Sequence, residues 1–552
     1  MYKNFFKHTG CSFLIVCIFL HTANAENIYV STTGDDLNNG HTLHAAFKTI
    51  QKALDSAKPG DSILVSAGIY KQNLTWKNSG TVEAPVVLKQ RGNGKVYLKS
   101  DDETAAAVLT ISNIRNIIID GFYITRDNAK NFCIGILIES SSDAITKNIE
   151  IKNCVFTNIN WSSDANKKPT ARQDAQPLIA YGRSSNPIQN LNIHDCEFMN
   201  NITGQSEVLS MDANIDGFTI TNNKLHDNSN IAIDAIGFEG ENSNVHIDQA
   251  RNGTIAKNTL WNNQSPYAEA GSIYVDGGKD ILIEQNLIYN GDYGIEISAE
   301  NNPSEIDYET ENITVRNNII YDCRSVGLKI GAYKGLMRNA LIANNTSFYN
   351  NRGGYRDGDT LNESRKIVPW SELVLDNMED VIIEDNIFYA RPGNKNTSML
   401  STDGISTLVN VKLNHNLYFN KGSEDGSGLQ FSYSGNHYSS WQNYQLANSS
   451  GFDKQSIYND PLFVKEGVSG NRVKDPDLHI QKNSPAIDAG DSGAVIDDKL
   501  GAFGKKDFFD NRRKIKIIDI GAHEFSNNKP VANSSEQIIQ KNSWGKIPAL
   551  TQ

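Results

Sequence analysis

A short pattern that recurs along most of the chain constrains its fold more than any other feature. An aliphatic residue is followed three positions later by asparagine and then, two positions on, by an apolar residue, as in Ile220, Asn223 and Leu225. Two early copies hold cysteine in place of asparagine. The positions that share this role are Cys154, Cys196, Asn223, Asn258, Asn286, Asn318, Asn345, Asn386 and Asn416. Such recurrence indicates a solenoid, in which each repeat packs on its neighbours.

The spacing and composition of the repeat identify the kind of solenoid. Consecutive positions are 27 to 42 residues apart, which indicates a coil of fixed minimum length that carries variable loops. The segments between them are short, alternating and rich in β-branched residues, so helical repeats are excluded. A propeller blade needs about 40–45 residues, which is longer than the shortest coil. The repeat therefore predicts an all-β coil of stacked parallel strands.

Asparagine suits the recurring position because its amide can bond the backbone at a turn and also bond its copy in the next coil. The small cysteine side chain tolerates burial in the same place. Cys154 and Cys196 would then be neighbours, and we expect two stacked thiols, with a disulfide as the alternative in an exported protein.

The two ends of the coil differ from its middle. Residues 42–58 carry apolar residues at helical spacing and predict an amphipathic helix that caps the open end of the coil. Beyond residue 430 the repeat fades, and the last residues are polar. We therefore divide the chain into five parts: a leader (1–25), an N-terminal cap with first coils (26–110), the repeats (111–430), C-terminal coils with a capping segment (431–525) and a flexible tail (526–552).

The N-terminus has the features of a secretory signal peptide. Lys3 and Lys7 precede an apolar run from Cys11 to Leu20, and Ala23 and Ala25 offer small residues for cleavage. The run is shorter than the roughly 20 residues that span a bilayer. We expect cleavage near Ala25 and Glu26, a secreted or periplasmic protein, and no membrane span in the mature form.

Charge limits the partners. The formal net charge is −12, and removal of the two lysines in the leader takes it to −14. No basic stripe is present, so nucleic acid is not an expected partner. An acidic surface also repels polyanions unless a metal or local bases compensate. We expect a monomer that binds a polysaccharide or oligosaccharide.

Segments at both ends resemble a known family. The N-terminal ones are IYVSTTGDDLNNG (28–40), FKTIQKA (47–53), KPGD (58–61) and SAGIY (66–70), and the C-terminal ones are NDPLFV (459–464), NSPAIDAG (483–490) and DIGAHE (519–524). Together with the repeat they resemble secreted proteins of the pectate-lyase-like superfamily. The resemblance implies a right-handed parallel β-helix with an N-terminal capping helix. It leaves the reaction open, because this superfamily contains lyases, hydrolases, epimerases and adhesins.

The strand that follows the recurring position in several coils suggests a site. If alternate aliphatic residues point inward, the outward residues form two columns. One column reads Asp212, Asp234, Asp276, Ser298 and Gly331, and the next reads Ser210, Ala232, Tyr274, Glu296 and Lys329. Coils about 4.8 Å apart would stack three aspartates, which is unfavourable unless a cation bridges them or a proton is shared. The alternative is that the register is wrong in one coil, or that the aspartates are separate turn residues.

Further polar residues follow these strands in the sequence and would line a groove along the same face. They are Glu239, Glu241, His246, Asp248, Arg251, Glu300, Tyr333 and Lys334.

Three functions fit these residues. A polysaccharide lyase would hold Ca²⁺ on Asp212, Asp234 and Asp276, since calcium takes 6–8 oxygen ligands. Its base would be Lys329 or Arg251, because lysine or arginine often serves in the superfamily that the chain resembles. We expect this reaction first, because a cation explains stacked acids more readily than shared protons do.

A glycoside hydrolase would instead use two carboxyl groups, Asp234 with Asp276 or Asp276 with Glu296, and would need no metal. Tyr274 lies between these acids and joins the candidate catalytic residues. The third possibility is a non-catalytic carbohydrate-binding protein, for which the acids are only surface.

Overall fold

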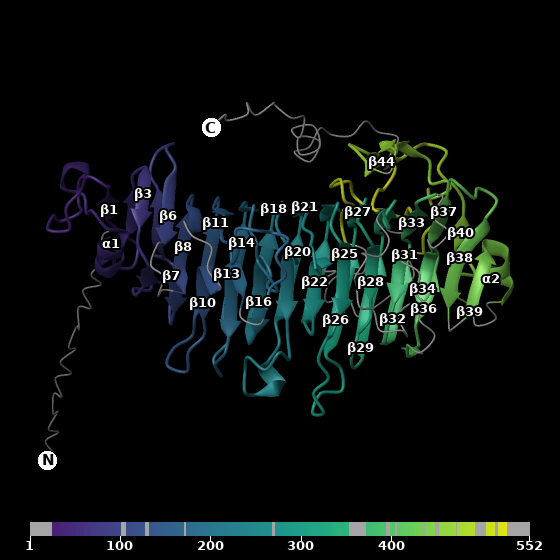
Figure 1. Ribbon diagram of the computed structural model, residues 1–552, viewed down its shortest axis with the longest axis horizontal. Helices are drawn as coiled ribbons and strands as arrows, with labels where there is room; N and C mark the ends of the chain where they lie inside the picture. Colours follow the sequence, from purple (N-terminus) through teal and green to yellow (C-terminus); the bar gives the residue numbers. More distant parts are fainter. Residues whose placement is uncertain are drawn as a thin grey trace, which may run out of the picture.

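The computed structural model describes residues 25–526 apart from 101–105, 127–131, 171–172, 268–270, 353–370, 393–397, 403–405, 434–435, 448–451, 471, 492–503 and 514–516. The chain winds into a long coil of parallel strands, whose axis is horizontal in Figure 1. Each turn adds one strand to each of three sheets, called A, B and C in the order in which the chain visits them. The predicted β-helix is confirmed. The predicted leader, up to residue 24, and the tail from 527 onward lie outside the described residues.

The strands of the coil are short, with at most nine residues in the longest, β13 (Asp174–Gly182). Sheet A consists of β1 (Asn27–Val30), β2 (Ser62–Val65), β5 (Val86–Gln90), β8 (Arg115–Asp120), β11 (Lys147–Lys152), β14 (Ile188–His194), β17 (Ile215–Thr221), β20 (Arg251–Ala256), β23 (Lys279–Glu284), β26 (Thr310–Arg316), β29 (Met337–Ala343), β32 (Met378–Glu384), β35 (Leu408–Val409) and β36 (Lys412–Asn414). Sheet B consists of β3 (Gly68–Lys71), β6 (Val96–Ser100), β9 (Tyr123–Arg126), β12 (Val155–Thr157), β15 (Glu197–Met199), β18 (Lys224–His226), β21 (Thr259–Trp261), β24 (Leu287–Tyr289), β27 (Ile319–Tyr321), β30 (Thr346–Phe348), β33 (Ile387–Ala390), β37 (Leu417–Asn420) and β40 (Ile457–Tyr458). Sheet C consists of β4 (Leu74–Trp76), β7 (Ala107–Ser112), β10 (Phe132–Glu139), β13 (Asp174–Gly182), β16 (Leu209–Ala213), β19 (Ile233–Ile236), β22 (Gly271–Asp276), β25 (Tyr293–Ser298), β28 (Val326–Ile330), β31 (Ser371–Leu375), β34 (Ser398–Thr402), β38 (Ser427–Tyr433) and β39 (Asn436–Ser440).

The predicted asparagine ladder forms the corner between sheets A and B. Asn318 Nδ2 donates to the Asn345 side chain at 2.9 Å and to the Ile283 carbonyl at 3.0 Å, and the Asn318 side chain accepts from Asn286. The same pattern continues to Asn416, and the thiols of Cys154 and Cys196, both free and buried, begin the ladder. The side chains thus satisfy backbone groups at a corner where the strands end.

A second ladder stands at the corner between sheets B and C, and the sequence analysis did not identify it. Asn201 Nδ2 donates to Asn228 Oδ1 at 2.9 Å, and Asn228 donates in turn to Asn263 Oδ1 at 2.9 Å. In later coils Asn350 and the buried Glu372 take over this position. Two corners of the coil are therefore fixed by side-chain amides.

Both open ends of the coil are covered. Helix α1 (Ile50–Ser56) buries Ile50, Ala53 and Leu54 against the first coil, as the helical spacing predicted. Thr49 caps this helix by accepting from the Lys52 backbone N–H. At the other end β39 runs antiparallel to β38, and α2 (Trp441–Ala447) buries Tyr444.

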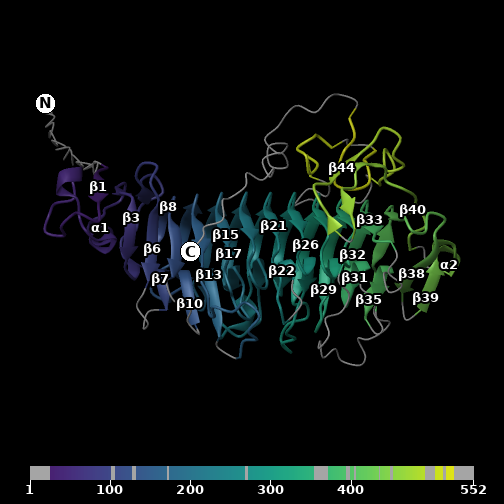
Figure 2. The same ribbon diagram turned by 45° about the horizontal axis from the view of Figure 1, so that its top comes forward.

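After the last coil the chain returns to the outer face of sheet B. The described residues between 459 and 526, which we call the C-terminal lobe, contain two small antiparallel pairs: β41 (Phe463–Lys465) with β44 (Asp477–Ile480), and β42 (Val468–Ser469) with β43 (Arg472–Val473). The lobe lies beside β33 in both ribbon views (Figures 1 and 2) and beside β27 in Figure 1. It buries an apolar cluster that includes Phe348 and Tyr389 of sheet B.

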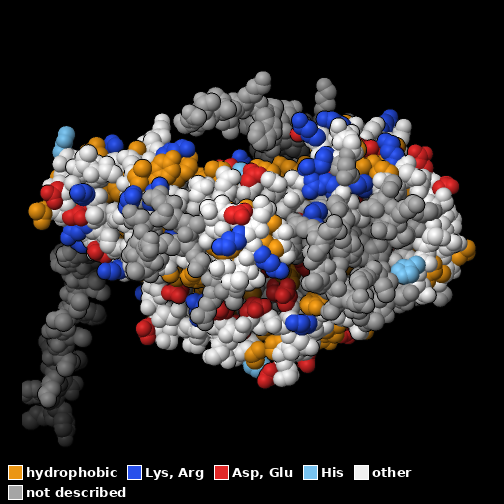
Figure 3. All heavy atoms as spheres, in the orientation of Figure 1, with side chains coloured by type: hydrophobic (Ala, Val, Ile, Leu, Met, Phe, Trp, Pro, Cys, Tyr) orange, Lys and Arg blue, Asp and Glu red, His pale blue; other side chains and the backbone are white. Residues whose placement is uncertain are grey.

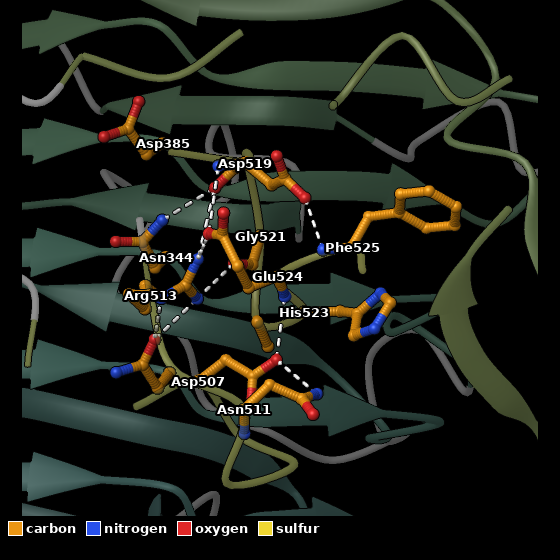
Figure 4. A network of polar contacts seen from close by, with 12 residues as sticks. Asn344, Asp385, Asp507, Asn511, Arg513, Asp519, Gly521, His523, Glu524 and Phe525 are labelled. Carbon is orange, nitrogen blue, oxygen red and sulfur yellow. Dashed lines mark hydrogen bonds and ion pairs between the residues drawn. The ribbon is translucent and has the colours of Figure 1, made fainter. Parts of the chain in front are cut away.

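A buried arginine fastens the lobe to the coil (Figure 4). Arg513 donates to Asn317 Oδ1 at 2.7 Å and to the Gly521 carbonyl at 2.7 Å, and it lies 3.3 Å from Glu524 Oε2. Beside it, Asn344 Nδ2 donates to the Asp519 carbonyl at 3.1 Å. The segment that resembles the family's C-terminus, 519–524, thus forms the contact between lobe and coil.

Asn318→Ala should destabilise the coil by about 2–3 kcal/mol, because it leaves buried backbone carbonyls and the neighbouring asparagines without partners. Chemical denaturation with hydrogen exchange at residues 283–346 measures the effect. Asn192→Ala, on the outer face of β14, is the control and should change little. Equal stability of the two variants would contradict a structural role for the ladder.

Arg513→Met should loosen the lobe, since breaking a buried ion pair typically costs about 3–5 kcal/mol. Hydrogen exchange and limited proteolysis should then report faster opening within 459–526, while the coil stays protected. Arg512→Met changes an exposed neighbour and should behave as the wild type. If residues 459–526 open as slowly in the Arg513 variant as in the wild type, Arg513 does not anchor the lobe.

Candidate functional site

The acids of sheet C lie in two columns, but not in the predicted ones. The pairing of β16, β19, β22, β25 and β28 sets the two sets of outward residues. One column contains Ser210, Asp234, Tyr274, Glu296 and Lys329, and the other contains Asp212, Ile236, Asp276 and Ser298.

The predicted stack of Asp212, Asp234 and Asp276 is therefore wrong by two residues in one coil. Ile233 and Ala235 point inward in β19, rather than Ile231 and Ile233, and Ile236 stands between Asp212 and Asp276. Ile231 lies at the corner before β19 begins, and its carbonyl accepts a hydrogen bond from the Val208 backbone N–H in the preceding coil. Ala235 takes the inward position that the sequence pattern assigned to Ile233.

The four central acids are nevertheless on one face and almost fully buried. Asp212, Asp234, Asp276 and Glu296 expose 6%, 3%, 6% and 5% of their surface. In Figure 3 a row of acidic side chains crosses the middle of the molecule, below a projecting part of the surface. We call this row, with the residues around it, the acidic groove.

Burial disfavours the ionised form of the central acids. It raises the pKa of Asp212, Asp234 and Asp276 well above the ordinary value, and neighbouring acids raise each pKa further. Burial also raises the pKa of Glu296, but the ion pair with Lys329 opposes that shift. The pKa of Tyr274 is raised by the same causes, burial first. The groove therefore favours the protonated forms of these side chains.

Glu207 belongs to the groove, although sequence reasoning missed it. It stands just before β16, in a turn that Asp174 holds by accepting from the Gln205 backbone N–H at 3.2 Å. Burial and the charges of Asp174, Asp276 and Glu239 raise the pKa of Glu207 to about 8. No periodicity marks a residue in a turn, so the only available signal was its position directly before an acidic strand.

Two loops carry further acids to the groove. Glu239 accepts from Asn301 Nδ2 at 2.6 Å, which joins the loop after β19 to the loop after β25. Glu241 pairs with Arg183 at 2.5 Å. On the second loop, Glu300 accepts from the Tyr274 hydroxyl at 3.2 Å.

Lys329 lies at the C-terminal side of the acids. Its ammonium group is 2.6 Å from Glu296 and 3.9 Å from Asp376. Tyr333 is bound through its backbone N–H to Ser298 Oγ at 3.0 Å and leaves its side chain exposed. The predicted base is thus beside the acids, as the sequence suggested.

Arg251 and His246 are not brought to the acids, whereas Asp248 lies near enough for its charge to act on Asp212. Arg251 begins β20 in sheet A and donates to Asn214 Oδ1 at 2.9 Å, with Asp216 at 3.6 Å. Asp248 is buried and accepts from the backbone N–H groups of residues 240 and 242, which shapes its loop. His246 is exposed on the same loop.

The described part of the chain contains neither a ready metal-binding cluster nor a membrane-spanning helix. No group of three or more His, Cys, Asp or Glu side chains there is arranged to hold a metal ion. Within the same ranges no helix has the length and apolar character needed to cross a membrane.

The raised pKa of Glu207 predicts a pH-dependent stability. The ordinary pKa of Glu207 is 4.5 and the folded value is about 8, so the folded state binds the proton more tightly. This contribution is complete below the unfolded pKa and is lost as pH rises through the folded pKa. Glu207→Gln should therefore match the wild-type Tm at about pH 4 and exceed it at about pH 9.

Thermal melts between these pH values measure the difference. Glu305→Gln, on an exposed loop, is the control and should follow the wild type throughout. Parallel melting curves for Glu207→Gln and the wild type would refute the raised pKa.

Known proteins resemble this chain in sequence and in structure. In sequence, the chain is 29% identical over 472 residues to the uncharacterized protein YwoF of Bacillus subtilis, covering 82% of this chain and 92% of that protein. In structure, it resembles a complex of XylC with xylose, at a TM-score of 0.50 and 12% identity, over 91% of this chain and 98% of that one. The pectate lyase Pel9A has a TM-score of 0.41 and 13% identity, over 91% of this chain and 96% of that one.

Family membership follows from a match to a family model. The model of the right-handed β-helix region matches residues 135–347 and 243–449, which together are more than half of the chain. This match agrees with the three sheets of parallel strands and confirms the predicted right-handed parallel β-helix. The chain belongs to the right-handed β-helix family.

Proposed function

We propose that the protein is an exported, carbohydrate-active enzyme that hydrolyses glycosidic bonds in the acidic groove. One observation carries the proposal: two buried carboxyl groups, Asp276 and Glu296, lie on neighbouring strands in different electrostatic environments. Because the fold hosts several reactions, only the residues of the site can identify the reaction of this protein.

The register sets the separation of this pair. Glu296 lies beside Tyr274, two residues before Asp276 on β22. With strands about 4.8 Å apart and a rise of roughly 3.3 Å per residue, the two Cα atoms are about 8 Å apart. A Cα separation of this size allows the two carboxyl groups to reach the spacing of about 6.5–9.5 Å that leaves room for a water molecule in inverting glycoside hydrolases.

The two environments divide the roles. Asp276 has no Lys, Arg or His partner in the described chain, and burial raises its pKa well above the ordinary value. It therefore keeps a proton that it can donate to the leaving oxygen. Glu296 is 2.6 Å from Lys329, which stabilises its ionised form for activating water. Such a difference between two acids in one site assigns acid and base.

Tyr274 stands between the two acids and stays protonated, because burial raises its pKa. Its hydroxyl donates to Glu300, whose backbone N–H donates to Asp276 Oδ1 at 2.8 Å. This chain fixes the orientation of the Asp276 carboxyl group. Tyr274 is therefore a positioning residue in the proposed reaction.

A calcium-assisted lyase is the second candidate, favoured by the position of Lys329 beside the acids. The ion pair with Glu296 occupies the ammonium group that would have to act as the base. Asp234 lies outside the column of Asp212 and Asp276, so the three aspartates lack the predicted stacking. Both features favour hydrolysis, and calcium dependence remains a prediction for experiment.

The variants Asp276→Asn and Glu296→Gln should each lower kcat by about 10²–10⁴-fold, the usual contribution of a general acid or base. Glu305→Gln should keep the full rate. Proton NMR of the first product should show inversion of the anomeric configuration. Retention of configuration, or full activity in either variant, would contradict the assigned pair.

The substrate screen uses neutral, amino and uronate polysaccharides, each with calcium and with EDTA. We expect new reducing ends without absorbance from unsaturated uronates, and no loss in EDTA. Calcium-dependent absorbance would establish the lyase instead. Binding without any cleavage would support the non-catalytic alternative.

A further inference from the structure

Three buried acceptor atoms in the groove have no hydrogen-bond partner in the described chain: Ser210 Oγ, Asp212 Oδ1 and Asp234 Oδ1. Their residues expose 0%, 6% and 3% of their surface. Ser210 is directly opposite Asp234 in the neighbouring strand and two residues from Asp212 on its own strand. We call these three residues the acceptor patch. Buried acceptors are normally satisfied, so the patch indicates a ligand that donates hydrogen bonds.

The charge around the patch is one-sided. Asp212 and Asp234 form no ion pair with the described Lys, Arg or His residues. The acids whose charge acts on them are Glu207, Glu239, Glu241, Asp248, Asp276 and Glu300. Two bases beside the groove already pair with other acids, Arg183 with Glu241 at 2.5 Å and Lys329 with Glu296 at 2.6 Å, and a third, Lys334, acts on Glu239. A positive ligand would relieve this repulsion, whereas a uronate would increase it.

An ammonium group matches the patch in both number and charge. It has three N–H donors and no acceptor, and the patch offers three acceptors. Hydrogen bonds between an ammonium and a carboxylate are stronger than those between neutral groups. An acetamide offers one N–H donor and no charge, so it would leave acceptors unsatisfied.

We propose that the substrate is a glycan containing amino sugars with free amino groups, and that the acceptor patch binds one of these groups. This inference rests on the proposed function. Asp234 lies on the strand next to β22, which carries Asp276. A glycan lying along the coil would therefore place the amino group of one sugar residue at the patch and the adjoining glycosidic bond at Asp276 and Glu296.

Binding should release protons. Burial and the neighbouring acids raise the pKa of Asp212 and Asp234, and a bound ammonium lowers it again by favouring the ionised carboxylates. Proton release is absent for a neutral sugar that simply donates hydrogen bonds. It is therefore a readout that separates ammonium recognition from general sugar binding.

The test is isothermal titration of the full chain with oligomers of glucosamine and of galactosamine. Fully N-acetylated oligomers of the same length and oligogalacturonate are the comparisons. Titration in two buffers of different ionisation enthalpy gives the number of protons released. We expect one amine series to bind at least about tenfold more tightly than its acetylated form, a 1.4 kcal/mol difference. Proton release and weaker binding in salt should accompany it.

Asp212→Asn and Asp234→Asn should each remove most of this preference and the proton release, while Glu305→Gln keeps both. Circular dichroism checks that the variants fold, and Ser210→Ala provides a milder change that should weaken amine binding alone. Equal or tighter binding of acetylated oligomers or oligogalacturonate would overturn the inference.

Reducing-end assays on the same oligomers keep the two proposals apart. Amine-selective binding without cleavage would refute the hydrolase and leave the acceptor patch supported. Cleavage of acetylated or uncharged glycans alone would support the hydrolase and refute amine recognition.

Discussion

The hydrogen bonds of the buried asparagine side chains at the corner between sheets A and B are the interaction on which the rest of the structure depends. At this corner the backbone leaves one sheet and enters the next, so neighbouring strands cannot satisfy all of its polar groups. Asn318 and its copies fill that gap by bonding both the backbone and each other. Because the corner is fixed from inside, the loops elsewhere can vary in length. The loop that carries Glu239 and Glu241 is one of these variable loops.

The groove uses the rigidity that the coil supplies. Strands on both sides hold Asp234 and Asp276 in place, so the backbone cannot move to separate their charges. Burial raises the pKa of both carboxyl groups and so favours their neutral form, which can donate a hydrogen bond or a proton. Protein stability is lowered by such a cluster, and this cost is expected where a site is built for chemistry.

The sequence predicted the coil, the A/B ladder and the capping helix because each depends on local periodicity. The inward pairs of β22, β25 and β28 were also correct, since only one alternation of aliphatic residues fits them. The register failed at β19 by two residues, because Ile231, Ile233 and Ala235 lie on one alternation and the pattern favoured the two isoleucines as the inward pair. Alanine gave no signal that it points inward.

The groove itself was harder to predict. Glu207 and Arg183 enter it from turns and from distant coils, and no short pattern links Arg183 to Glu241, 58 residues away. Arg251 was placed near the acids because it is close in sequence to their loop, yet the chain has already turned into sheet A. Nearness along the chain is a weak guide in a coil, where the neighbours in space are one full turn away.

The C-terminal lobe has a consequence for the order of assembly. Its contacts run along one corner of the coil, from Lys257, which pairs with Asp510, to His415, which lies 3.8 Å from Asp491. These positions exist together only when the coils between them have formed, so the lobe can close last, as a latch on a finished structure. A coil can grow one turn at a time, whereas the lobe joins turns that form far apart in that order. Its contacts tie the coils from Lys257 to His415 to one another along the outside of the coil.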